Sequence, residues 1–223
     1  AEAAYNVGRT ALANARYDVA FRCYSKAVEL DPEHDDAIWG LAEACHARGD
    51  AAAAIGWYRR YLAIHPDSSG ALHMIAALGG AEAPSRASDD YVRETFDDFA
   101  EDFDRQLLED LNYEAPRLLA AAFAAVTGGE AAGLDILDAG CGTGLSGLAF
   151  RPVARWLVGV DLSPGMLDRA RARSLYDALE EAEVGAYCGA HPASFDLIVA
   201  ADVFCYFGDL SQVLEQAYVA LRP

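Results

Sequence analysis

The chain runs Leu134-Asp135-Ile136-Leu137-Asp138-Ala139-Gly140-Cys141-Gly142-Thr143-Gly144 shortly after its midpoint. Leu134 to Leu137 form an apolar run of strand length, which an acidic residue and three alternating glycines follow. Glycine has no Cβ, so the main chain can adopt positive φ and a ligand can lie directly against it. The stretch therefore predicts a strand that ends in a tight, ligand-binding turn. A helix beginning near Leu145 would direct free N–H groups to the same place.

A second strand signal follows at Trp156-Leu157-Val158-Gly159-Val160-Asp161. This apolar run also ends in a carboxylate, and Asp161 lies 21 residues after Gly140. In a βαβ unit, an acidic residue at this distance and at the tip of the second strand binds ribose hydroxyls. Its two oxygens can accept hydrogen bonds from both the 2′ and the 3′ hydroxyl. The pattern therefore predicts a site for an unphosphorylated ribose.

Three motifs occur in order: Asp138-x-Gly140-x-Gly142-x-Gly144, then Gly159-Val160-Asp161-Leu162-Ser163-x-x-Met166-Leu167-x-x-Ala170, then Phe195-Asp196-Leu197-Ile198. Over residues 134–223 this set resembles the class I S-adenosylmethionine-dependent methyltransferase family. The resemblance implies an α/β fold with a Rossmann-like, doubly wound parallel sheet, incomplete at its C-terminal end, and S-adenosyl-L-methionine as the cofactor. Leu145 stands where the dinucleotide-binding motif has its third glycine, which disfavours the rival assignment of a nucleotide-dependent oxidoreductase.

The resemblance also implies a set of cofactor-binding positions. Residues just after the acidic strand tip flank the adenine in the family, although core packing is a competing role for Met166. Glu183 stands near the place where the family often has an aspartate beside the adenine amino group. Ligands bind beyond the carboxyl ends of parallel strands, so the residues after a strand over 195–201 should line the site. The implied set is Asp138, Ala139, Gly140, Cys141, Gly142, Gly144, Asp161, Leu162, Met166, Glu183, Asp202, Val203 and Tyr91.

Composition restricts the partners and the compartment. The formal net charge is −18 in 223 residues, with Lys26 the single lysine, so the overall field repels phosphate backbones and anionic lipid. We therefore expect neither a nucleic acid nor a membrane as partner. No apolar run approaches the roughly 20 residues of a membrane span, and we expect a cytoplasmic protein. The five cysteines are scattered and form no C-x-x-C pair, which indicates reduced packing residues and no metal site.

The N-terminal part repeats itself with a period of 34 residues. Ala20 and Ala54, Tyr24 and Tyr58, and Pro32 and Pro66 are each separated by this distance. The pattern resembles the tetratricopeptide repeat, with whole repeats at 1–34 and 35–68 and the first helix of a third at 69–78. The small residues let the two helices of a hairpin approach closely, and the proline ends the second helix. Such repeats bind a peptide or protein partner, or serve as a spacer or dimerisation surface, and the sequence does not distinguish these roles.

The predicted organisation places the repeat domain at 1–80, a linker at 81–88, a helical lead-in or lid at 89–130 and the methyltransferase domain at 131–223.

In the lead-in, apolar residues at helical spacing follow a Ser88 or Asp89 cap: Val92, Phe96, Phe99, Phe103 and Leu107. The acidic residues Asp97, Asp98, Glu101, Asp102 and Asp104 lie on the opposite face. They are interpreted as solvated, and the alternative is an electrostatic field around the cationic sulfonium. The segment is similar to the lead-in helix of many small-molecule methyltransferases, and the resemblance implies a lid over the cofactor. Tyr91 would then contact the methionyl end or the substrate, or else lie in the core. Further helices are predicted at 115–126, after Ser163-Pro164, and at 210–221.

We interpret the chain as an enzyme that transfers a methyl group from S-adenosylmethionine to a small-molecule, carrier-bound or protein acceptor. The sulfonium is already an excellent leaving group, so alignment and exclusion of water make up most of the catalytic demand. No catalytic residue is therefore assigned. His191, Asp202 and Tyr206 are the nearby candidates for a base, and a surface role suits His191 better. The alternative function is a repeat-based adaptor whose methyltransferase-like domain is catalytically silent.

Overall fold

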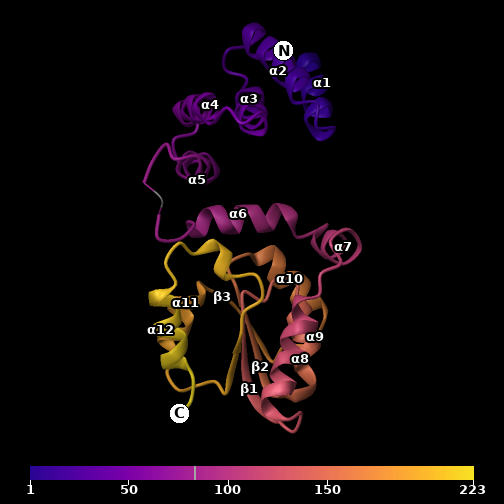
Figure 1. The fold of residues 1–223 in the computed structure, drawn as a ribbon, viewed down its shortest axis with the longest axis vertical. Coiled ribbons are helices and arrows are strands. Elements are labelled where there is room, and N and C mark those ends of the chain that lie inside the picture. Colours follow the sequence, from indigo (N-terminus) through magenta and orange to yellow (C-terminus); the bar gives the residue numbers. More distant parts are fainter. Residues whose placement is uncertain (83) are drawn as a thin grey trace. The chain divides into compact units, whose positions relative to one another are not determined.

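The computed structural model describes residues 1–82 and 84–223. The chain divides into two compact units, Ala1–Pro84 and Ser85–Pro223, each of which is described by itself (Figure 1). None of the described helices is both long and apolar enough to cross a membrane.

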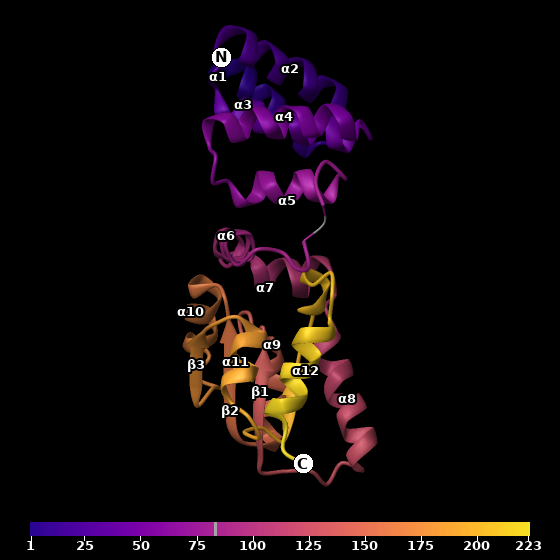
Figure 2. The same ribbon diagram turned by 90° about the vertical axis from the view of Figure 1, so that its left-hand side faces the viewer.

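The first unit consists of antiparallel helical hairpins at the predicted period (Figure 2). The helices are α1 Glu2–Ala13, α2 Tyr17–Leu30, α3 Asp35–Ala47, α4 Ala51–Ile64 and α5 Ser69–Ala77. Polar side chains cap three of them, since His34, Asp50 and Ser68 each accept a hydrogen bond from a main-chain N–H of the following helix. The turn inside the second hairpin has Gly49 at φ +79°. The equivalent turn of the first hairpin has no glycine, and Ala15 adopts φ +55° there, in the left-handed region that favours glycine.

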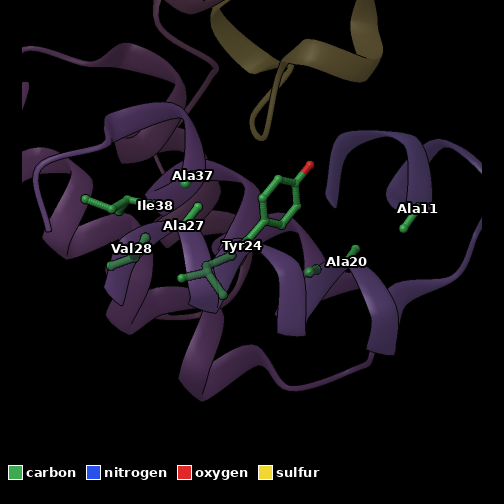
Figure 3. Close-up of a cluster of buried hydrophobic side chains, with 9 residues drawn as sticks. Ala11, Ala20, Tyr24, Ala27, Val28, Ala37 and Ile38 are labelled. Carbon is green, nitrogen blue, oxygen red and sulfur yellow. The ribbon is translucent and has the colours of Figure 1, made fainter. Parts of the chain in front are cut away.

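The core of the first unit consists of two clusters rich in alanine, one around Tyr24 and one around Tyr58. Ala20, Ala27 and Ala37 are fully buried beside Tyr24, which is 2% exposed (Figure 3). The ring lies between two glycines on neighbouring helices. A Cβ on Gly8 of α1 would lie 2.7 Å from the ring, and a Cβ on Gly40 of α3 would lie 2.5 Å from it. Small residues therefore permit the close approach of α1, α2 and α3, as the repeat pattern predicts.

Gly40→Ala is expected to destabilise the first unit by about 1–3 kcal/mol, because the added methyl overlaps a ring that its neighbours hold in place. Gly56→Ala on α4 is the matched control. Its Cβ meets nothing within 4 Å, so the gain in helix propensity should stabilise the unit by up to about 1 kcal/mol. Urea unfolding in a Trp156→Phe background, followed by the fluorescence of Trp39 and Trp57, measures both. Equal effects of the two substitutions would contradict this packing.

The second unit contains a four-stranded parallel sheet in the order β3-β2-β1-β4. Its strands are β1 Leu134–Ala139, β2 Ala154–Asp161, β3 Ala178–Glu181 and β4 Leu197–Val199. Successive residues of β1 point to opposite faces. Ile136 packs with Phe123 of α8 (Ala115–Thr127) and Phe150 of α9 (Leu145–Phe150). Leu137 and Ala139 pack with α11 (Val184–Ala190) and α12 (Ser211–Ala220) (Figure 1). Helices on both faces make the predicted doubly wound sheet.

Two short 3₁₀ turns and one further helix lie between these elements. Short 3₁₀ turns, η2 Arg151–Val153 and η3 Phe204–Tyr206, follow α9 and β4. Helix α10 (Pro164–Ala172) begins as predicted at Ser163-Pro164, with the Ser163 hydroxyl accepting from the Met166 N–H. Strand β4 is shorter than the predicted 195–201. Phe195 instead pairs with Leu221, and the main chain turns at Asp202, where φ is +57°.

The segment before α8 differs from its prediction in two ways. The apolar spacing suggested a continuous helix through Leu107, whereas the structure has α6 Asp89–Phe99, a turn, α7 Phe103–Arg105 and the π-helix η1 Gln106–Asp110. The predicted linker 81–88, apart from Ala83, which lies outside the described residues, is also partly ordered by contacts. Ala87 N–H donates to the Tyr206 carbonyl, and the Ser85 carbonyl accepts from Gly208 and Asp209. These bonds join the start of the second unit to the loop after β4.

Candidate functional site

A cavity of about 350 Å³ opens at the carboxyl ends of β1, β2 and β4. This is the edge at which ligands of parallel α/β sheets bind, and the volume lies within the range of small-molecule sites. The cavity is lined by nine of the residues that the sequence implied: Gly140, Cys141, Gly142, Asp161, Leu162, Met166, Glu183, Asp202 and Val203. Tyr91, Asp138, Ala139 and Gly144 lie outside the lining.

The turn after β1 is built from glycines in left-handed conformations. Gly140, Gly142 and Gly144 have φ of +67°, +52° and +92°, which other residues adopt only at a cost. A Cβ on Gly140 would lie 2.3 Å from Cγ2 of Val203, so this glycine lets the loop after β4 approach. A Cβ on Gly142 would meet only Phe103, at 3.9 Å, and its main chain borders the cavity. Because Gly142 has no side chain, the main chain of the turn is open to the cavity here and forms a cradle against which a ligand can lie.

Asp161 at the end of β2 joins two turns. One carboxylate oxygen accepts from the Gly142 N–H at 2.8 Å and the other from the Ser163 N–H at 2.9 Å. Burial raises the pKa of Asp161, and the charge of Asp97 raises it further, while the main-chain N–H donors lower it. The carboxylate also borders the cavity. Each oxygen keeps acceptor capacity beyond its single main-chain bond, which is what a pair of ribose hydroxyls requires.

Asp138 lies under the glycine turn and is 2% exposed. The Tyr176 hydroxyl donates to one of its oxygens at 2.6 Å. Among the described residues, the other oxygen is the single buried side-chain polar atom without a hydrogen-bond partner. Burial raises the pKa of Asp138 to about 7. Tyr176 fits against this site because Gly147 and Gly159 have no Cβ; one added there would lie 2.5 Å and 2.9 Å from the Tyr176 side chain.

The lead-in segment forms an apolar wall of the cavity. The five residues that the spacing singled out, Val92, Phe96, Phe99, Phe103 and Leu107, all line it. The rings meet edge to face, with centroids 5.6 Å apart for Phe99 and Phe103 and 5.5 Å apart for Phe96 and Tyr206. The break after α6 preserves this apolar face. The segment therefore lines the cavity, and its action as a lid stays a prediction. Tyr91 is not one of the lining residues.

The acidic face of this segment is not wholly solvated, which corrects the sequence interpretation. Asp97 accepts from the Ser163 hydroxyl at 2.5 Å and from the Gly165 N–H at 2.9 Å. Asp104 accepts from the Thr143 hydroxyl at 2.5 Å and pairs with Arg173. A helical projection could not reveal these partners, since they lie 39 to 69 residues away in the chain. Asp98 makes none of these contacts and remains exposed.

Polar side chains gather where β4 ends. The Tyr113 hydroxyl donates to Asp202, and both residues line the cavity. Burial, followed by this hydrogen bond, raises the pKa of Tyr113, and burial raises that of Tyr206 to about 12. Sequence reasoning missed Tyr113, because nothing in its neighbourhood marks it as different from the other aromatics. His191 lies outside the lining and stacks on Tyr187 at a centroid distance of 4.1 Å, so it is not brought to the site as a base.

Glu183 reaches the cavity from the end of the β3 region. Its two oxygens accept from the N–H groups of Gly185 and Ala186, at 2.9 and 2.7 Å, and so cap α11. This local role explains why a glutamate stands here. Its contact with an adenine remains a prediction.

Two family models match the chain. A methyltransferase domain matches residues 136–223, and a tetratricopeptide repeat matches residues 5–69. Methyltransferase-like protein 27 from Homo sapiens is 40% identical over 91 residues, covering 40% of this chain and 37% of that protein. The 18S rRNA (guanine-N(7))-methyltransferase from Bos taurus is 31% identical over 97 residues, covering 35% of this chain and 34% of that protein. The match thus spans little more than a third of each of these relatives.

A solved structure shares the fold over about two thirds of this chain. The DhpI-SAM-HEP complex aligns with a TM-score of 0.50 and 17% sequence identity, covering 64% of this chain and 64% of that chain. At this identity the likeness concerns the fold alone.

Proposed function

We propose that this chain, which belongs to the class I S-adenosylmethionine-dependent methyltransferases and carries N-terminal tetratricopeptide repeats, binds S-adenosylmethionine in its cavity and methylates an acceptor. The observation that carries the proposal is the conjunction of an open glycine cradle at Gly142 with the Asp161 carboxylate at the rim of the same cavity.

The residues present suit this cofactor. Asp161 would hold the ribose hydroxyls, and Leu162 and Met166 supply apolar surface for the adenine. The main chain at Gly140 and Gly142 would lie along the amino-acid part of the cofactor. When bound, the cofactor supplies a methyl group activated by a sulfonium.

The residues of the chain then provide alignment and a dry environment. The rings of Phe96, Phe99 and Phe103 exclude water from the cavity and leave few polar groups to solvate an attacking atom. An acceptor with an ionisable hydroxyl or amine must also lose a proton. Asp161 and Glu183, the other carboxylates of the lining, each accept two main-chain N–H bonds, so Asp202, which accepts from the Tyr113 hydroxyl, is proposed as the base.

The acceptor is proposed to be a small molecule, or a group carried by a protein. One relative is named for a ribosomal RNA acceptor. This chain carries a net charge of −18 and a single lysine, so a phosphate backbone would be repelled from it. The repeats are proposed to bind a peptide or protein partner, which would suit a protein-borne acceptor. Sedimentation of the full chain tests their other role, since a concentration-dependent dimer would favour self-association.

Asp161→Ala is expected to weaken binding of S-adenosylhomocysteine about tenfold to hundredfold. The substitution removes charge-assisted hydrogen bonds worth roughly 1.5–3 kcal/mol. Isothermal titration calorimetry on the full chain measures the change. Asp168→Ala is the control, because Asp168 is exposed on α10 and pairs with Arg171. Unchanged affinity in Asp161→Ala would place the ribose elsewhere, and no heat from the unmodified chain would favour the adaptor function.

A further inference from the structure

We infer that Asp97 and Asp104 are positioning residues that fasten the lid, residues 89–110, to the two turns that hold the cofactor. Closure of the lid and retention of the cofactor are therefore coupled. The inference rests on the proposed function, because it assigns a ligand to the cavity that the lid covers.

The first fastening lies between α6 and the start of α10. The Asp97 Oδ1 atom accepts from both the Ser163 hydroxyl and the Gly165 N–H. A Cβ on Gly165 would lie 3.1 Å from that oxygen, so the glycine permits the approach. The Ser163 N–H donates to Asp161, the proposed ribose ligand. Ser163 therefore donates two hydrogen bonds. Its hydroxyl donates to Asp97 of the lid, and its main-chain N–H donates to Asp161.

The second fastening lies between α7 and the glycine turn. Thr143, which is 1% exposed and stands between Gly142 and Gly144, donates its hydroxyl to Asp104. Arg173 joins both parts, since its guanidinium pairs with Asp104 and its Nε–H donates to the Thr143 carbonyl at 2.7 Å. The position of the lid is thereby linked to the conformation of the turn that forms the cofactor cradle.

Little else holds the lid in place. None of the residues of α6, α7 and η1 is buried, and Ala100 in the turn between them is 7% exposed. Arg93 approaches Glu181 at 3.7 Å, and Arg169 approaches Glu101 at 3.9 Å, but these side chains are one-third to nine-tenths exposed. Neither pair is close enough for a hydrogen bond, whereas Asp97 and Asp104 each accept from a hydroxyl at 2.5 Å. The aromatic wall and the two carboxylates are therefore the main attachments.

Coupling follows from the shared turns. A ligand that orders the glycine turn and Asp161 also orders Thr143 and Ser163, the two hydroxyl donors to the lid. Because coupling is reciprocal, a fastened lid stabilises the bound ligand by the same factor as the ligand stabilises the closed lid. Loosening the lid should act mainly on the dissociation rate, since a closed lid obstructs exit.

The test compares Asp97→Ala, Asp104→Ala and their double variant with Asp98→Ala, in which the neighbouring exposed carboxylate is removed. Hydrogen exchange of the full chain without ligand should be at least about tenfold faster over residues 89–110 in the double variant, and unchanged in Asp98→Ala. The dissociation rate of S-adenosylhomocysteine should rise about five- to tenfold, with a smaller change in the association rate. Asp104→Ala combined with Thr143→Val should be less than additive, because both remove the same hydrogen bond.

Lid exchange and dissociation in the double variant equal to those in Asp98→Ala would overturn the inference while leaving the proposed function intact. Faster lid exchange without faster dissociation would overturn the coupling. A failure of the unmodified chain to bind S-adenosylhomocysteine would overturn the proposed function, and the coupling with it.

Discussion

Gly140→Val is expected to destabilise the second unit by about 3 kcal/mol or more and to reduce binding of S-adenosylhomocysteine below detection. Gly140 has φ +67°, and a β-branched residue held there costs roughly 1–3 kcal/mol. The new Cβ would also lie 2.3 Å from Cγ2 of Val203, and overpacking of this kind costs roughly another 1–3 kcal/mol. Because Val203 lines the cavity, its displacement changes the shape of the site.

Gly133→Val separates the two costs. Gly133 has φ +72°, but a Cβ there meets nothing within 4 Å, so this variant keeps the backbone strain without the clash. Urea unfolding followed by circular dichroism gives the loss of stability, and calorimetry on the folded fraction gives the affinity. We expect Gly133→Val to lose about 1–3 kcal/mol of stability and to bind normally. Normal binding by folded Gly140→Val would contradict the assigned role of this turn.

Asp138→Asn is expected to remove about 3 kcal/mol of pH dependence from the stability of the second unit between pH 5 and pH 8. Burial raises the pKa of Asp138 to about 7 in the folded chain, from 3.8 for an unperturbed aspartate. The folded state therefore prefers the protonated form. Its stabilising contribution is complete below pH 3.8 and is lost progressively as the pH rises to about 7. Asparagine cannot ionise and has no such loss.

The measurement is the free energy of unfolding of the two proteins at several pH values. The difference between variant and parent should shift in favour of the variant as the pH rises, whatever its offset at pH 5. Asp196→Asn is the control, because hydrogen bonds from the Asp135 N–H and the Arg222 guanidinium lower the pKa of Asp196, so it stays ionised over this range. A constant difference between Asp138→Asn and the parent would show that Asp138 is already charged at pH 5.

Much of the fold could be predicted because its signals are local or periodic. The glycines after Leu137 and the acidic end at Asp161 fix two strands and the turn between them. The 34-residue period fixes five helices, and both predictions are confirmed. Strand β4 was predicted too long, because an apolar run does not reveal that Asp202 turns the main chain. The break in the lead-in helix likewise preserves the apolar spacing from which the helix was predicted.

In the candidate site, too, some residues could be placed from the sequence and others could not. The residues at strand ends could be placed from the sequence, because a parallel sheet brings these ends together. Tyr113 and the carboxylates of Asp97 and Asp104 could not, because their roles arise from partners distant in the chain. An acidic helix face has the same pattern whether it meets water or a hydroxyl donor. Tyr176, which supports Asp138 from beneath the turn, was missed for the same reason.

A crystal structure of the full chain with S-adenosylhomocysteine tests the central claim most directly. The account predicts ligand density in the cavity, with the ribose hydroxyls on Asp161 and the main chain of Gly140 and Gly142 beside the amino-acid part. Residues 89–110 should cover the ligand. Density for the ligand at another place, or a cavity filled by the chain's own side chains at saturating ligand, would contradict it.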